Sequence, residues 1–368
     1  MIATIIGANV VSISAIAYVY LSTRPGNNVS ETVVSSSSVP ADQFVVNTTP
    51  PAHKAPGKSV TLPIPGSPTG VQVTAVSSSY VDLSWNDSVM DRNAYIVYRG
   101  TSPVFKRASP VGSTPGTTFM DKNVQPGTVY YYWVAAQNAA GTSTPKTAVK
   151  VQTYLSWSQI QQRYQDSIVK IKTYTTAFGA FGSAVEGSGW FAPGGYIVTN
   201  WHVIRHWNWV IDVTLHNDGG KYRGQMYHAK VVYESQEHDL AVLKLENGWS
   251  GAALPVGETM ATNGQRVAAL GHPGGEALTL TQGRVVATGL DQSVSTIGTL
   301  PDMTRSTIPC VGGSSGSPVF NGYGQVVGVM ESADPNDGNI SYFVPSVFLS
   351  QWGIIGSAAP QPETIQTN

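Results

Sequence analysis

The chain has 368 residues, which is enough for two domains with some length to spare. Its formal net charge is -1, so it has no basic excess to neutralise a phosphate backbone, and we expect no nucleic-acid partner. The single cysteine, Cys310, excludes an intramolecular disulfide framework and a zinc site of the CxxC type. The 38 glycines and 23 prolines favour short strands and tight turns over long helices.

An uncharged, mostly apolar run over residues 2–21 is the first distinctive segment. A helix of about 20 residues is about 30 Å long, enough to cross a bilayer. A cleaved signal peptide is the alternative, but no Lys or Arg precedes the run, and residues 21–24 make a poor cleavage site. We therefore predict a single-pass transmembrane anchor within residues 1–24. The protein would be secreted if this segment were cleaved.

Residues 25–66 change in character, with seven prolines and a serine run at 35–38, and cannot build a core. We predict a Pro/Ser/Thr-rich linker here. We expect the remainder of the chain to be extracytoplasmic, whether lumenal, periplasmic or on a virion surface.

Residues 67–154 contain short alternating strands separated by turn residues, which implies an antiparallel sandwich. Trp85 closes the second strand, and Pro126-Gly127 precedes Tyr130. The segment resembles a fibronectin type III domain. That resemblance implies that Trp85 is a core tryptophan and that the Tyr130 hydroxyl bonds back to the main chain. The fold is almost silent on function, so we expect a spacer and leave open a protein or glycan ligand.

A second block of short strands covers residues 155–352 and suits two small barrels packed together. The fold class predicted for the whole chain is therefore all-β. A short helix is expected at 156–164 and another near 347–352. The polar tail, residues 353–368, is predicted to be disordered.

Three segments of this block carry candidate chemistry: residues 199–203 with His202, 237–243 with Asp239, and 312–320 with Ser315. A serine hydroxyl is a poor nucleophile at neutral pH and needs a base with a pKa near 7, which histidine supplies. A buried carboxylate holds the imidazole in one tautomer, and Asp239 stands where a polar loop enters an apolar strand. The glycines around Ser315 allow the backbone N–H groups of Gly313 and Ser315 to converge on an oxyanion.

The block is similar to chymotrypsin-fold serine endopeptidases, nearest to the HtrA-type and glutamyl-endopeptidase branches. The order His202, Asp239, Ser315 is the chymotrypsin order. This resemblance implies a protein or peptide substrate and no cofactor. The motifs that carry it, in chain order, are GSGWF at 187–191, GYIVTNWHV at 195–203, HDLAVLKL at 238–245, GHPGG at 271–275, QGRV at 282–285 and GSSGSPVFN at 313–321.

The sequence departs from these families at several positions. Ser314 stands where trypsin-like zymogens carry an aspartate, and Met330 stands in place of the glutamyl-endopeptidase specificity histidine. Strand alternation from Met330 predicts that Glu331 points away from the substrate pocket. The residue before the scissile bond, P1, is therefore expected to be small or medium and apolar. The predicted pocket residues are Pro309, Cys310, Val311, Met330 and Ser332.

Two alternatives remain open at this point. The first is a catalytically retired protease fold that serves as an adhesion or structural protein of an envelope or virion. The second is a zinc site at His202 and His206, four residues apart, but the segment lacks the glutamate of HExxH, so no metal is expected. Cys310 lacks a histidine of its own and is interpreted as an apolar pocket wall.

Overall fold

The computed structural model describes residues 62–86, 92–174, 184–205, 210–215, 224–294, 297–351 and 353. All of them lie in the compact unit Val60–Asn368. The predicted anchor, the linker up to residue 61 and the tail beyond residue 353 lie outside the described residues. Within the described ranges, no helix is both long enough and apolar enough to cross a membrane.

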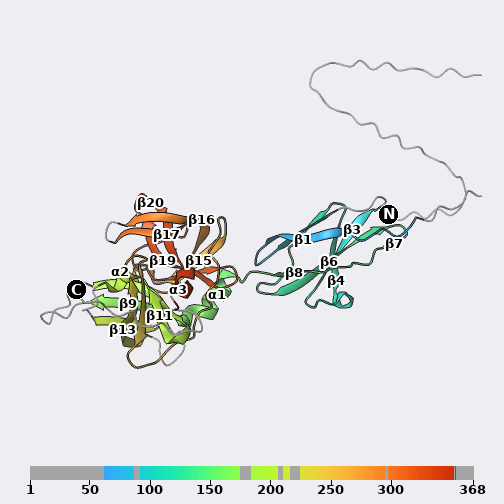
Figure 1. Cartoon of the computed structure of the whole chain (residues 1–368). Coiled ribbons are helices and arrows are strands. Elements are labelled where there is room, and N and C mark those ends of the chain that lie inside the picture. The colour runs from blue at the N-terminus through green and yellow to red at the C-terminus, as the bar shows by residue number, and fades with distance from the viewer. Residues whose placement is uncertain are drawn as a thin grey trace, which may run out of the picture. The chain divides into compact units, whose positions relative to one another are not determined.

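The first described domain is a two-sheet sandwich, as its alternating strands predict (Figure 1). A 3-10 turn, η1 (Phe105–Arg107), follows the strand β3 (Ala94–Gly100). One sheet has the order β1-β2-β5, with β1 (Thr69–Val76), β2 (Val81–Asn86) and β5 (Thr118–Asp121). The second has the order β4-β3-β6-β7, with β8 paired to β6; its strands are β3 (Ala94–Gly100), β4 (Ser109–Thr114), β6 (Val129–Asn138), β7 (Gly141–Thr142) and β8 (Val149–Gln152).

The core of this sandwich confirms two expectations. Trp85 is buried, and its ring meets that of Tyr95 edge to face with centroids 5.2 Å apart. The Tyr130 hydroxyl accepts a hydrogen bond from the main-chain N–H of Gln125 at 2.9 Å, five residues upstream.

The second domain begins with α1 (Trp157–Tyr164), whose start is fixed by a capping box between Ser156 and Gln159. A 3-10 turn, η2 (Gln165–Ser167), leads from it into a closed barrel of the order β10-β11-β14-β13-β12-β9. The strands of this first barrel are β9 (Ile168–Tyr174), β10 (Ala184–Ala192), β11 (Tyr196–Thr199), β12 (Val210–Leu215), β13 (Met226–Ser235) and β14 (Leu240–Leu245).

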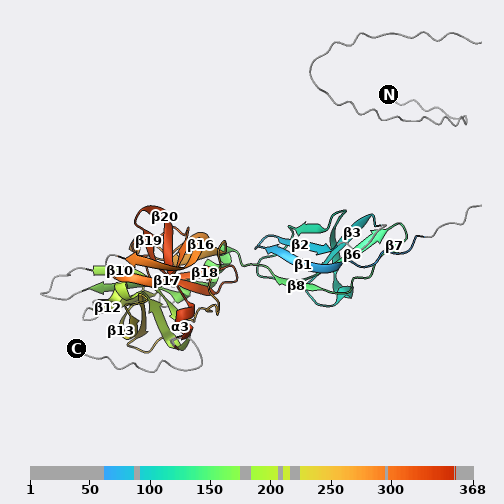
Figure 2. The ribbon, with the colours of Figure 1, turned by 45° about the horizontal axis from the view of Figure 1, so that its top comes forward.

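A second closed barrel follows, of the order β15-β16-β17-β20-β19-β18, and lies beside the first in both views (Figures 1 and 2). The helix α3 (Val347–Gln351) comes after it. The second barrel's strands are β15 (Arg266–Gly271), β16 (Thr279–Val294), β17 (Gly298–Ser306), β18 (Pro318–Asn321), β19 (Val326–Asp334) and β20 (Asp337–Pro345).

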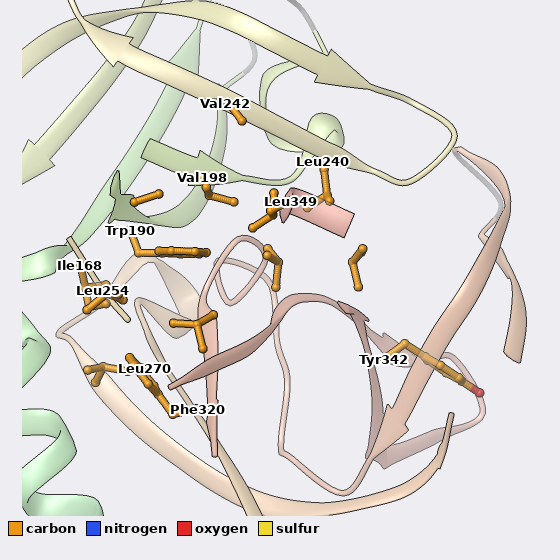
Figure 3. Close-up of a cluster of buried hydrophobic side chains, with 14 of the residues drawn as sticks. Ile168, Trp190, Val198, Leu240, Val242, Leu254, Leu270, Phe320, Tyr342 and Leu349 are labelled. Carbon is orange, nitrogen blue, oxygen red and sulfur yellow. The ribbon is translucent and has the colours of Figure 1, made fainter. Parts of the chain in front are cut away.

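One apolar cluster is shared by the two barrels (Figure 3). Trp190 and Val242 come from the first barrel, Leu270 and Phe320 from the second, and Leu349 from α3, and all five are buried. Burial of large side chains of this kind stabilises by about 1.5–3 kcal/mol each. Because each barrel supplies part of the other's core, the residues at the junction are held on two rigid elements.

Candidate active site

His202 lies on the short helix α2 (Trp201–Ile204), directly after β11. Its neighbours Val203 and Ile204 are buried in the core of the first barrel, and the Thr173 hydroxyl donates a hydrogen bond to the main-chain oxygen of Val203 at 2.9 Å. These contacts anchor one side of the helix turn. The His202 side chain itself is 22% exposed, so it reaches the surface of the site.

Asp239 is fully buried and holds His202 through both carboxylate oxygens. Its Oδ2 lies 2.8 Å from His202 Nδ1, and its Oδ1 accepts a hydrogen bond from the His202 main-chain N–H at 2.8 Å. The backbone of Asp239 is in the left-handed region, with φ 49°, which aspartate tolerates better than most residues. Asn200 Nδ2 donates a hydrogen bond to the main-chain oxygen of Asp239 at 2.9 Å, which also holds the backbone of Asp239 in place. Nδ1 is thereby committed to Asp239, and Nε2 is the ring nitrogen left for proton transfer.

Opposing effects act on the charge of the imidazole. Burial lowers the pKa of His202, but the hydrogen bond and the negative charge of Asp239 raise it, with a further contribution from Glu331. The positive charge of Arg205 opposes them, and the net result is a pKa of His202 above its ordinary value. The site therefore favours the imidazolium form more than water does.

Ser315 lies in the loop that precedes β18 and lines the same cavity as His202, of about 240 Å³. Its hydroxyl donates a hydrogen bond to the main-chain oxygen of Glu331 at 2.8 Å. Among the described residues, no hydrogen bond joins the Ser315 hydroxyl to His202. The serine and the histidine share one cavity, and in this conformation the Ser315 hydroxyl is bonded to Glu331 and not to the ring.

Gly313 adopts φ 89°, which favours glycine, and a Cβ there would lie 2.5 Å from the main-chain oxygen of His272. The oxygen of Gly312, in the same peptide unit as the Gly313 N–H, accepts from Gly274 N at 2.6 Å. In a trans peptide the C=O and N–H point in opposite directions, so the Gly313 N–H points away from Gly274. Neither this N–H nor that of Ser315 has a hydrogen-bond partner among the described residues.

Ser188 on β10 connects the first barrel to this loop. It is fully buried, and its main-chain N–H donates to the oxygen of Ser315 at 2.7 Å. Its hydroxyl donates to the oxygen of Gly313 at 2.9 Å and accepts from the N–H of His272 at 2.9 Å. Sequence reasoning passes over Ser188, although it lies inside the GSGWF motif, because its partners are more than 80 residues away.

The cavity differs in part from the predicted pocket. Cys310, Val311 and Ser332 line it, as the sequence predicts. Pro309 is exposed and Met330 packs in the core of the second barrel, so neither of them lines it. Glu331 and Ala333, from the same strand as Ser332, also line it, as do Val294, Ile297 and Gly312, which sequence reasoning missed.

The predicted orientation of Glu331 is wrong, because its side chain turns toward the cavity. It is only 2% exposed and lines the cavity. Against β20, Met330 pairs with Phe343 and Ser332 with Tyr342, so β19 has one extra residue, a bulge at Glu331. The bulge interrupts the alternation from which the opposite orientation was predicted.

Burial has a strong effect on two ionisable groups at the cavity. It raises the pKa of Glu331 to about 7, with the charge of Asp239 adding to the shift and a hydrogen bond from Ser332 opposing it. Burial also raises the pKa of Cys310 to about 12, so its thiol stays protonated at neutral pH. A protonated thiol is a poor nucleophile, which supports the interpretation of Cys310 as a pocket wall.

His202, Asp239 and Glu331 each have one side-chain donor atom within 4.8 Å of those of the other two, a spacing that a metal ion can bridge. Two of these groups already hydrogen-bond each other, and Ser332 Oγ donates to the third. We therefore interpret the cluster as a hydrogen-bonded network. His206, the other residue of the hypothesised zinc pair, lies outside the described residues.

The comparisons agree with this architecture. The family model for a trypsin-like peptidase domain matches residues 187–329, and that for a fibronectin type III domain matches residues 66–152. A probable periplasmic serine endoprotease, DegP-like, from Chlamydia pneumoniae is 33% identical over 173 residues, covering 46% of this chain and 33% of that protein. The chloroplastic Protease Do-like 1 of Arabidopsis thaliana is 32% identical over 209 residues, covering 53% of this chain and 45% of that protein.

Among solved structures, a serine endoprotease from Yersinia pestis is 25% identical with a TM-score of 0.44, covering 54% of this chain and 65% of that one. The chain thus spans between a third and a half of the length of the two curated relatives.

Two closed six-stranded barrels, with His202 and Asp239 on the first and the Ser315 loop on the second, are the architecture of the chymotrypsin fold. The chain contains a trypsin-like peptidase domain of this fold, preceded by a fibronectin type III domain.

Proposed function

We propose that the chain is a serine endopeptidase that hydrolyses peptide bonds with His202, Asp239 and Ser315. Ser315 is the nucleophile, His202 the general base and Asp239 the group that orients and stabilises the imidazolium. The N–H groups of Gly313 and Ser315 form the oxyanion hole. The substrate is a protein or peptide, and the chemistry uses no cofactor.

The observation that carries this proposal is the pair of hydrogen bonds that Asp239 accepts from His202, one from the ring at 2.8 Å and one from the main-chain N–H at 2.8 Å. A carboxylate that fixes both the ring and the backbone of one histidine defines the tautomer that a general base needs. Because Ser315 lines the same cavity, we expect rotation about its Cα–Cβ bond to engage the base.

The reaction follows from these positions. Oγ of Ser315 attacks the substrate carbonyl carbon while its proton passes to Nε2 of His202, and the developing oxyanion is met by the two N–H groups. His202 then gives that proton to the leaving amine, and the C–N bond breaks. Water, deprotonated by the same histidine, releases the acyl group and restores the Ser315 hydroxyl.

The arrangement along the chain belongs to the same proposal. Residues 155–352 form the catalytic domain, residues 67–154 a spacer, residues 25–66 a linker, and residues 1–24 a membrane anchor with the catalytic domain on the extracytoplasmic side. The uncharged run at 2–21 supports the anchor. Several relatives are described as periplasmic, which supports the extracytoplasmic placement.

A second candidate is a retired protease fold with an adhesive or structural role. The hydrogen bond from the Ser315 hydroxyl to the oxygen of Glu331, instead of to His202, favours it. The two candidates differ in whether Ser315 reacts.

An active-serine phosphonate probe separates them, with the Ser315→Ala protein as the control. We expect covalent labelling and peptide-library cleavage in the unaltered chain, and neither in Ser315→Ala. Absence of both in the unaltered chain, correctly folded, would establish the retired fold. Full cleavage by Ser315→Ala would assign the reaction to other residues.

A further inference from the structure

Glu331 is a buried carboxyl group for which the reaction above has no use. At 2% exposure it has lost nearly all contact with water, and burial of an unneutralised carboxylate is costly. A glutamine or a leucine at this position would avoid that cost. The backbone bulge in β19 nevertheless aims the carboxyl group inward, beside Met330, which already fills the barrel core.

The surroundings of Glu331 come from four elements. His202 belongs to α2, and Asp239 directly precedes β14; the charges of both act on Glu331. Arg205, the C-terminal cap of α2, acts on His202. Cys310 lies in the nucleophile loop, and its thiol is affected by the charge of Glu331. The neutral neighbour is Ser332, whose hydroxyl donates to Glu331 Oε2.

The donor atoms of Glu331, His202 and Asp239 lie within 4.8 Å of one another, so the imidazole is close to two carboxyl groups instead of one. Asp239 forms the direct hydrogen bonds. Glu331 acts at longer range, through charge, and it raises the pKa of His202. Coulombic effects over such distances are strong at a site with little water.

The main chain of Glu331 also belongs to the site, because its carbonyl oxygen accepts the hydrogen bond of the Ser315 hydroxyl. The same bulge therefore sets both the position of the carboxyl group and the resting position of the nucleophile. Because one backbone feature places both groups in the site, the burial of this carboxyl group points to a role in the site.

We infer that Glu331 is a positioning residue of the active site, whose carboxylate charge governs how readily His202 accepts the proton of Ser315. This inference rests on the proposed function. Above neutral pH the site holds two carboxylates around a neutral imidazole, and both stabilise the imidazolium that forms in the transition state. Below neutral pH Glu331 carries a proton, and that assistance is lost. Glu331 itself gives no proton to the substrate and takes none from it.

The test is Glu331→Gln, which keeps the volume and an acceptor for Ser332 but removes the charge. We expect kcat on the alkaline plateau to fall about tenfold, with KM little changed, because the interaction is made in the transition state. The acid limb of the kcat/KM profile should move to lower pH, since the charge that raises the pKa of His202 is gone. The matched control is Glu258→Gln, the same change at an exposed position in the segment between β14 and β15, which should move neither quantity.

A second readout does not depend on activity. In a Ser315→Ala background, NMR titration of His202 should give a lower pKa when Glu331→Gln is added. If no hydrolysis is found but this pKa falls, the proposed function fails and the coupling stands. If hydrolysis is found but the acid limb and the His202 titration both stay in place, Glu331 is a structural residue and the inference is wrong. Activity that a chelator abolishes would also overturn it, by making Glu331 a metal ligand.

Discussion

The first barrel holds its two catalytic candidates by side-chain hydrogen bonds, whereas the second barrel holds its site residues mainly through the main chain. Asp239 binds His202 with both carboxylate oxygens. In the second barrel, Gly316 N donates to the oxygen of Met330 at 2.9 Å, and the peptide before Gly313 is held by Gly274. The first half of the site therefore depends on the chemical identity of its side chains, and the second half depends on backbone shape. This difference predicts which substitutions each half tolerates.

The largest effect should come from removing one functional side chain in either barrel. His202→Ala and Ser315→Ala should each lower kcat by several orders of magnitude, and the double variant should be little worse, because the residues act as a unit. Single-turnover peptide hydrolysis measures this. Losses that multiply in the double variant would show that the barrels contribute independently.

Backbone shape in the second barrel is tested by Gly313→Ala. The φ of 89° and the 2.5 Å approach to the His272 oxygen force the peptide to move, which displaces an oxyanion donor. We expect a fall in kcat of roughly 10²–10³-fold with the fold retained. Gly338→Ala, at a position where a Cβ meets open space, is the matched control. A Gly313→Ala enzyme of normal kcat would remove this N–H from the mechanism.

The shared core tests whether the two halves are one cooperative unit. Phe320 on β18 is fully buried and stacks on Tyr164, with ring centroids 5.3 Å apart. Phe320→Ala should lower the free energy of unfolding by about 3–5 kcal/mol. Hydrogen exchange should then increase in the strands of the first barrel as well. Met226→Ala, at a side chain that is 60% exposed, should change stability by less than about 0.5 kcal/mol. Faster exchange confined to the second barrel would contradict a common core.

The pH dependence of activity and stability reflects two ionisable groups, His202 in the first barrel and Glu331 at the bulge of the second. Because the pKa of His202 is raised, the neutral base is lost as pH falls through a value above 6.5, and kcat/KM should drop about tenfold per pH unit below it. The raised pKa of Glu331, about 7, means that the folded chain binds an extra proton between pH 4.5 and 7. That group's contribution to stability should therefore decline as pH rises through this window. A kcat/KM limb at or below 6.5 would contradict the raised pKa of His202.

The same contrast explains how much of the site the sequence predicts. His202, Asp239 and Ser315 stand in short motifs beside buried strands, so local pattern is enough to propose them as catalytic residues. The orientation of Glu331 depends on how β19 pairs with β20, and a one-residue bulge reverses the alternation without any local signal. Val294 ends β16, Ile297 lies in the turn after it, and both reach the cavity because β16 runs for 16 residues. That length is decided by its pairing with β17. Contacts that depend on strand register are the ones that sequence reasoning missed.

The smallest expected effect is on substrate choice. The cavity has a volume of about 240 Å³, which suits a small or medium apolar P1 side chain such as Val, Ala or Leu. Its wall includes Val294, Ile297 and Val311, and shape discriminates by only about 1–3 kcal/mol per misfit methylene, so the preference should be broad. Ala333→Val narrows the cavity and should reduce cleavage after Leu more than after Ala, by about tenfold. Ala252→Val, on an exposed loop, should leave the ratio unchanged.

Because Glu331 points into the cavity, the substrate preference should also be measured at two pH values. A bound Lys or Arg side chain would need a carboxylate, and Glu331 becomes one only as pH rises past about 7. If the charge of Glu331 acts only on His202, the preference for apolar P1 residues should be the same at pH 6 and pH 8. The rate should then be lower at pH 6 by the same factor for every substrate. If the charge of Glu331 instead meets the substrate, cleavage after Lys or Arg should appear at pH 8 and vanish both at pH 6 and in Glu331→Gln. A library profile at the two pH values decides between these outcomes, because the first changes the rate for every substrate alike and the second changes their order.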